Sequence, residues 1–165
     1  MKRAYTLFTL FVAVIMLLTN VGCTMKSDVT ADIIRVENGK FIRHGEPYYF
    51  VGTNFWYGAI LGSEGQGGNR ERLHQELDFL ESIGIDNLRV LVGGDGENGI
   101  PTRIQPSLQT APGVYNDTIL DGLDYFMNEL KKREMTAVLY LNNSWEWSGG
   151  YSLYLQWAGH GKAVV

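Results

Sequence analysis

The most regular pattern of apolar and polar positions lies between Asn69 and Gly84. Apolar residues recur there at steps of four and three, and charged residues fill the positions between them. This spacing places the apolar residues on one face and predicts an amphipathic helix that stops at Gly84. The apolar positions are Leu73, Leu77, Leu80 and Ile83.

A second apolar stripe predicts a helix over Thr118–Arg133. Asn116 or Asp117 can cap its first turn, and three basic residues at its end suit the helix dipole. The stripe consists of Ile119, Leu120, Leu123, Phe126, Met127 and Leu130.

The other ordered segments have the composition of strands. Asn38-Gly39 supplies the positive φ angles of a two-residue turn, so it predicts a hairpin between Ile33–Glu37 and Lys40–Arg43. Runs of β-branched, aromatic and apolar residues predict three further strands, over Tyr48–Trp56, Asn87–Gly93 and Thr136–Asn143. Two loops are expected, a glycine-rich one over 58–68 and a long irregular one over 93–116.

Strands that alternate with amphipathic helices indicate a parallel sheet covered by helices. The two main candidates are a doubly wound open sheet and a (β/α)₈ barrel. Gly94–Gly99 matches the dinucleotide pattern G-x-G-x-x-G, but that pattern needs a helix at its last glycine, and Ile100-Pro101 follows instead. We therefore interpret the match as accidental.

Polar and aromatic residues gather where the expected strands end. Asn54 and Trp56 end the first strand, Arg89 lies within the second, and Asn143 and Trp145 follow the third. The carboxyl ends of parallel strands share one edge of the sheet, which is the active-site face of a (β/α)₈ barrel. This placement favours the barrel.

Arg89 stands between Leu88 and Val90, so we expect a buried guanidinium that needs an anionic partner. A snorkelling arginine and an ordinary buried ion pair are the alternatives. Trp56 and Trp145 could stack on sugar rings while Asn54 and Asn143 bind sugar hydroxyls. Core or rim packing is the alternative for the tryptophans.

Composition excludes several classes of protein. The 165 residues carry 14 basic and 18 acidic side chains, a net charge of −4, and lack the basic stripe that nucleic acids require. The three histidines show no ligand spacing, so we expect neither a metal nor another cofactor. The acidic loop residues are interpreted as solvated charges: Glu64, Asp95, Glu97 and Glu146.

Residues 1–22 have the pattern of a bacterial lipoprotein signal peptide. Lys2 and Arg3 precede a short apolar segment, and Cys23, the only cysteine, follows Gly22. This predicts export across the inner membrane and a lipid anchor on Cys23, in the periplasm or at the cell surface. Residues 23–32 would form a tether; an uncleaved membrane anchor is the alternative.

Four blocks of sequence, in order, resemble the endo-β-1,4-mannanases of glycoside hydrolase family 5. The resemblance implies a (β/α)₈ barrel and retaining hydrolysis of β-mannan by two glutamates. The blocks are GTNFWYG (52–58), ELDFLESIGIDNLRVLVGG (76–94), PGVYNDTILDGLDYFMNELKKREM (112–135) and LNNSWEWSGGYSLYLQW (141–157).

The resemblance also implies roles for three residues. Arg89 matches the arginine that supports the family's nucleophile, Trp145 a tryptophan that stacks on a mannosyl unit, and Trp56 an aromatic residue at the mouth of the first strand. Neither glutamate position is reached. Residues 33–165 are therefore interpreted as the first three βα units of an incomplete barrel preceded by a β-hairpin.

Three expectations follow from this interpretation. The chain alone is predicted to be inactive, and its uncovered sheet edges are predicted to favour aggregation. Tyr151–Trp157 is expected to find no wall to pack on. The alternatives in function are another family 5 β-glycanase, such as a cellulase or a β-mannosidase, and a non-catalytic glycan-binding surface lipoprotein.

Overall fold

The computed structural model describes residues 33–161, and the chain divides into two compact units, Met1–Tyr49 and Phe50–Val165. The predicted signal peptide, the tether and the lipidated Cys23 lie outside the described residues. Within residues 33–161, no helix is long and apolar enough to cross a membrane.

The described part of the first unit is a small antiparallel sheet. Strands β1 (Arg35–Glu37), β2 (Lys40–Arg43) and β3 (Glu46–Pro47) pair in that order. Asn38 and Gly39 have φ angles of 50° and 74°, which confirms the predicted turn.

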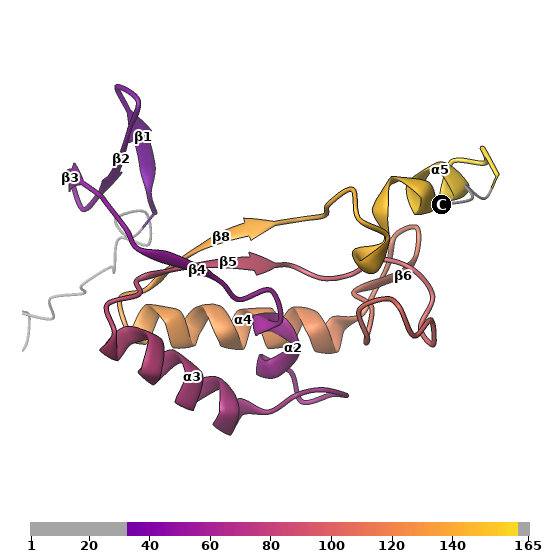
Figure 1. The fold of residues 1–165 in the computed structure, drawn as a ribbon, viewed down its shortest axis with the longest axis horizontal. Coiled ribbons are helices and arrows are strands. Elements are labelled where there is room, and N and C mark those ends of the chain that lie inside the picture. The colour runs from indigo at the N-terminus through magenta and orange to yellow at the C-terminus, as the bar shows by residue number, and fades with distance from the viewer. Residues whose placement is uncertain (1–32, 162–165) are drawn as a thin grey trace, which may run out of the picture. The chain divides into compact units, whose positions relative to one another are not determined.

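The second unit contains the parallel sheet. Strand β4 (Gly52–Asn54) pairs with β5 (Asn87–Leu91), which pairs with β8 (Thr136–Tyr140). The strand predicted over Tyr48–Trp56 was too long, because only Gly52–Asn54 is paired with β5. Three parallel strands with helices between them, in a sheet that does not close within residues 33–161, correspond to the expected partial (β/α)₈ barrel (Figure 1).

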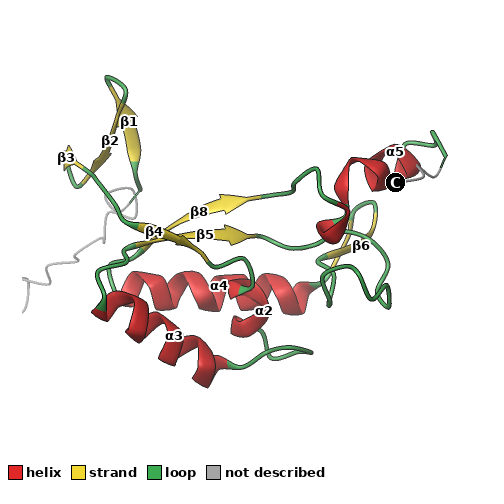
Figure 2. Ribbon diagram, in the orientation of Figure 1, coloured by secondary structure: helices red, strands yellow, loops and turns green. Residues whose placement is uncertain are grey.

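The two predicted helices are confirmed as α3 (Arg70–Ser82) and α4 (Asp117–Lys132). The side chains of Asn69 and Asn116 accept hydrogen bonds from the backbone N–H groups of Arg72 and Thr118 and so cap the helices. Both helices lie on the same face of the β4–β5–β8 sheet (Figure 2). Ile83 was wrongly assigned to the apolar stripe, because it lies just past the end of α3 and is exposed.

The segment predicted as a glycine-rich loop contains a short helix, α2 (Gly58–Gly62). Its glycines allow close packing on α4. A Cβ atom on Gly62 would lie 2.3 Å from the carbonyl oxygen of Gly122, and one on Gly122 would lie 2.3 Å from that of Ala59. The glycines therefore allow the two helices to contact each other, whereas the sequence pattern predicted only a loop.

The loops at the carboxyl end of the sheet are more ordered than expected. Residues 93–116 include a β-ribbon, β6 (Gln109–Ala111) with β7 (Val114–Tyr115). No helix begins at Gly99, as expected from the Ile100-Pro101 that follows it. A 3₁₀ turn, η2 (Glu146–Ser148), leads into α5 (Gly150–Trp157).

Helix α5 corrects the expectation that Tyr151–Trp157 would find nothing to pack on. Leu153 is buried, and its Cδ2 atom lies close to Gly96 of the 93–116 loop. Tyr151 and Leu155 are exposed, so only one side of α5 is covered in the described chain.

Candidate functional site

A hollow of about 810 Å³ opens where β4, β5 and β8 end. This volume lies within the range of small-ligand sites. All five residues predicted for substrate contact or nucleophile support line it. The complete lining is Asn54, Trp56, Arg89, Thr102, Tyr140, Asn143, Ser144, Trp145, Glu146 and Trp147.

Arg89 is exposed, so the expected buried guanidinium was wrong. Successive side chains of a strand point to opposite faces. Leu88 and Val90 therefore face α3 and α4, while Arg89 points to the opposite face of the sheet. Its Nη1 donates to Oδ1 of Asn54 at 3.4 Å, and its guanidinium lies 3.8 Å from the centre of the Tyr140 ring.

The expected anionic partner of Arg89 is not seen either. Within residues 33–161, Arg89 contacts an amide and an aromatic ring but forms no ion pair. The stack on Tyr140 is a cation–π contact that holds the guanidinium over the hollow. Arg89 thus brings an uncompensated positive charge to this face of the sheet.

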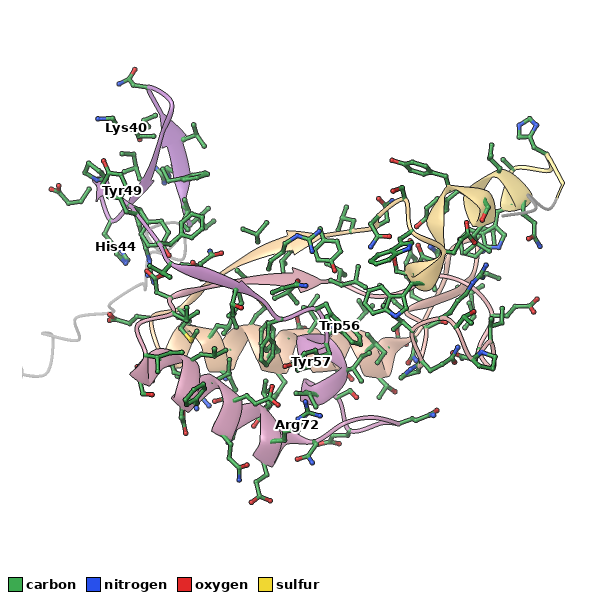
Figure 3. All side chains as sticks on the ribbon, viewed as in Figure 1. Lys40, His44, Tyr49, Trp56, Tyr57 and Arg72 are labelled. Atoms are coloured by element: carbon green, nitrogen blue, oxygen red, sulfur yellow. The ribbon has the colours of Figure 1, made fainter. Side chains whose placement is uncertain are left out.

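Trp56 and Tyr57 follow β4 and turn in different directions (Figure 3). The ring of Trp56 meets that of Trp147 edge to face, with centres 4.6 Å apart. Tyr57 belongs to the helix side, where its hydroxyl donates to Glu76 of α3 at 2.8 Å. Burial and this hydrogen bond raise the pKa of Tyr57 to about 12.

Trp147 also connects Trp56 with Trp145. The Trp145 and Trp147 rings are 6.4 Å apart and inclined at 56°. Trp145 is 72% exposed, so core packing does not account for it. Together the three indoles form an aromatic wall of the hollow.

Asn143 has a structural task in addition to its predicted contact with substrate. Its Oδ1 accepts hydrogen bonds from the backbone N–H of Trp145 and from the hydroxyl of Ser148, both at 2.8 Å. A side-chain oxygen that accepts from the backbone two residues later forms an Asx turn. Asn143 therefore shapes the loop that carries Trp145.

Asp95 and Glu146 were wrongly interpreted as solvated charges. Asp95 is only 8% exposed; it accepts a hydrogen bond from the Tyr154 hydroxyl and one from Nε2 of Gln109 at 3.4 Å. Burial, reinforced by the bond to Asp95, raises the pKa of Tyr154. These contacts join the 93–116 loop to α5.

Glu146 belongs to a second polar group between the same segments. One of its oxygens accepts from Nη2 of Arg103 at 3.4 Å, and the other accepts from the Ser152 hydroxyl. Its side chain also lines the hollow. The hollow at the strand ends is therefore lined by a carboxylate.

Sequence reasoning missed Thr102, Tyr140 and Ser144, and it gave no role to Glu146 or Trp147. The position of Tyr140 could have been inferred from the strand alternation. Val138 pairs with Arg89, and Tyr140 stands two residues after Val138, so its side chain lies on the same face of the sheet as Arg89. Thr102 had none, because it comes from the irregular loop. Within residues 33–161, no cluster of three or more His, Cys, Asp or Glu side chains could hold a metal ion.

The fold and the hollow define a class of protein. A parallel sheet whose helices cover one face, with aromatic and polar loops at its carboxyl ends, is the architecture of a (β/α)₈ barrel enzyme around its active-site face. The family model for GH family 5 beta-mannosidase-like proteins matches residues 31–164, and the chain belongs to this family.

Relatives and solved structures agree with this assignment. The chain is 33% identical over 131 residues to a putative mannan endo-1,4-beta-mannosidase 9 of Oryza sativa, covering 74% of this chain and 30% of the relative. Mannan endo-1,4-beta-mannosidase 5 of Solanum lycopersicum is 28% identical over 132 residues, covering 80% of this chain and 30% of the relative.

The family 5 mannosidase of Rhizomucor miehei superimposes with a TM-score of 0.75 at 36% identity, covering 81% of this chain and 33% of the other. An endo-1,4-beta-mannanase from the same organism shares the fold, with a TM-score of 0.61 at 22% identity. The chain thus spans about a third of the length of the relatives that it matches.

Proposed function

We propose that this chain forms a substrate-binding wall of a family 5 glycoside hydrolase that acts on β-1,4-mannan. The aromatic wall of Trp56, Trp145 and Trp147 is the observation that carries the proposal. Flat indole faces suit the apolar faces of pyranose rings. Named relatives that are mannan endo-1,4-beta-mannosidases support mannan as the polysaccharide.

The polar residues of the hollow complete this interpretation. Asn54 and Asn143 offer amides to sugar hydroxyls, and Arg89 offers guanidinium donors. Arg89 matches the family's arginine beside the nucleophile, and its lack of an ion pair within residues 33–161 leaves its charge available to a carboxylate or a ligand.

We further propose that the chain alone binds β-mannan without cleaving it. Retaining hydrolysis needs two carboxyl groups about 5–5.5 Å apart on either side of the scissile bond. Among residues 33–161, the hollow is lined by one carboxylate, Glu146, which Arg103 and Ser152 already engage.

Affinity electrophoresis in gels that contain galactomannan tests the binding. Migration of the purified chain should be retarded, and Trp145→Ala should restore most of its mobility. Equal retardation of both proteins would contradict a role for the aromatic wall. A zymogram tests inactivity, and a cleared zone above that of Arg89→Ala would overturn it.

A β-mannosidase acting on short β-mannosides is a second candidate. The Rhizomucor miehei mannosidase is 36% identical to this chain, whereas the mannanase of that organism is 22% identical. One structure of that mannosidase is a complex with mannosyl-fructose. Titration calorimetry discriminates the two, because a mannanase wall should bind mannohexaose more tightly than mannobiose, and a mannosidase site should bind both equally.

The lipid anchor is a separate proposal that rests on the pattern of residues 1–23. Cys23 would carry the lipid after cleavage behind Gly22. Labelling of expressing bacteria with radioactive palmitate should mark the wild-type protein and not Cys23→Ser. Equal labelling of both proteins would exclude Cys23 as the modified residue.

A further inference from the structure

Glu146 lies between two residues of the aromatic wall, Trp145 and Trp147, in the sequence. It opens the 3₁₀ turn η2 between Trp145 and Trp147, and its side chain lines the hollow with both indoles. It is also the one carboxylate among the lining residues of the described chain.

Two neighbours hold the carboxylate in place. Arg103, from the 93–116 loop, donates to one oxygen at 3.4 Å, and Ser152 of α5 donates to the other. Neither Arg103 nor Ser152 is among the residues that line the hollow. The backbone fixes the same junction, because the N–H of Ile104 donates to the carbonyl of Trp147 at 2.9 Å.

The carboxylate retains capacity for a ligand. An ionised carboxylate has about four acceptor positions and no donor, and Arg103 and Ser152 occupy two of them. Its side chain is 36% exposed. The remaining acceptor positions lie on a carboxylate whose two oxygens already accept hydrogen bonds. The side-chain torsions of Glu146 are therefore restricted before a ligand binds, and binding restricts few more.

We propose that Glu146 is a specificity-determining residue that accepts hydrogen bonds from hydroxyl groups of a sugar stacked on the neighbouring indoles. The inference rests on the proposed function and adds a contact at that same site. Acceptance by a charged group favours neutral sugars with free hydroxyls, and it disfavours units whose hydroxyl at this position is missing, acetylated or replaced by an acid.

Calorimetry with mannotriose and its monodeoxy analogues tests the proposal on the purified chain. Glu146→Gln should weaken mannotriose binding about tenfold, because it removes the charged acceptor. On the wild type, one deoxy analogue should bind about tenfold more weakly than mannotriose. On the Glu146→Gln variant, the same analogue and mannotriose should bind with equal affinity. This coupling identifies a direct contact.

Two control variants separate contact from loop support. Ser152→Ala removes one of the two groups that donate to the carboxylate, and Glu97→Gln removes an exposed carboxylate from the 93–116 loop. Glu97→Gln should bind mannotriose within about twofold of the wild type. Ser152→Ala should weaken binding less than Glu146→Gln does and should keep the wild-type loss of affinity for the same deoxy sugar. An affinity loss in Ser152→Ala equal to that in Glu146→Gln, without coupling to any deoxy sugar, would overturn the inference.

Failure of the proposed function has a different signature. Wild-type chain that binds neither mannotriose nor mannohexaose would overturn the proposed function and the contact that depends on it. Wild-type binding that Trp145→Ala abolishes but Glu146→Gln leaves unchanged would overturn the role of Glu146 alone.

Discussion

The two sides of the β4–β5–β8 sheet are built in different ways. On the helix side, Leu73, Leu77 and Phe126 are fully buried between regular helices and the strands. On the other side and at the carboxyl ends, the exposed Trp145, the half-buried Trp56 and Trp147 and several polar groups surround an open hollow. Periodic apolar packing thus carries the stability of the unit, while irregular loops present the chemistry.

Replacement of Phe126 should produce the largest loss of stability. Its ring stacks on Phe55, and its edge lies next to Gly58 of α2. Phe126→Ala leaves a cavity at the centre of the core and should lower the free energy of unfolding by about 3–5 kcal/mol. Urea denaturation measures this loss. The matched truncation on the other side, Trp145→Ala, should change stability by less than about 0.5 kcal/mol.

If Trp145→Ala lowered the free energy of unfolding as much as Phe126→Ala does, the conclusion that the helix side carries the stability of the unit would be wrong.

Close packing of α2 on α4 should be sensitive to one methyl group. Gly122→Ala would set a Cβ atom 2.3 Å from the carbonyl oxygen of Ala59. The helices must separate, which should cost about 1–3 kcal/mol despite the better helix propensity of alanine. Asn128→Ala, at an exposed position of α4, is the control and should stay within about 0.5 kcal/mol in the same denaturation experiment.

A charged cluster between α3 and α4 gives the helix side a pH dependence. The side chain of Glu129 is only 3% exposed and forms ion pairs with Lys132 and Arg133. Nε2 of His74 lies 3.5 Å from Oε2 of Glu129. Arg133 also forms an ion pair with Asp78. Burial acts to raise the pKa of Glu129, but hydrogen bonds from Lys132 and Arg133 outweigh it and hold the pKa below its ordinary value.

A carboxyl group with a lowered pKa in the folded state stabilises the protein above its unfolded pKa and loses this effect as the pH falls. Glu129→Gln should therefore cost about 1–2 kcal/mol at neutral pH. The difference from the wild type should shrink as the pH falls through about 4.3, the ordinary value for glutamate, toward the lower folded value. Thermal melts between pH 3 and 7 measure it.

The exposed Glu81 of α3 provides the control, because Glu81→Gln should track the wild type throughout. A constant difference between Glu129→Gln and the wild type across this pH range would contradict the role of the Glu129 charge.

Much of the helix side could be predicted from sequence, because periodicity reports directly which residues face the sheet. Helices α3 and α4 were found in this way; Asn116 was one of two candidate caps for α4, and Asn69 was not predicted as the cap of α3. Helix α2 was not, because its glycines are selected by contact with Gly122, which lies 60 residues along the chain from Gly62. The residues next to Gly62 in the sequence do not indicate a contact with a residue so far along the chain.

The site could be predicted only as far as strand geometry reaches. Parallel register places Asn54 beside Arg89, and alternation points Arg89 away from Leu88. The environments of Asp95 and Glu146 depend on Tyr154 and Arg103, which are 59 and 43 residues distant in the chain. Long loops that fold against each other create these contacts, so only the folded chain shows them.

The smallest expected effect is local and lies in the aromatic loop. Asn143 accepts hydrogen bonds from the Trp145 amide and the Ser148 hydroxyl. Asn143→Ala removes both, which should destabilise the loop by about 1 kcal/mol and leave the helix side intact. The Trp145 amide should then exchange with deuterium about five to ten times faster in NMR spectra, while the Leu77 amide in α3 exchanges at its wild-type rate. Asn143→Asp keeps an acceptor oxygen and should restore protection of Trp145. Faster exchange at Leu77 as well would show that the loop and the helix-covered core unfold together, and the contrast between the two sides of the sheet would then not extend to their dynamics.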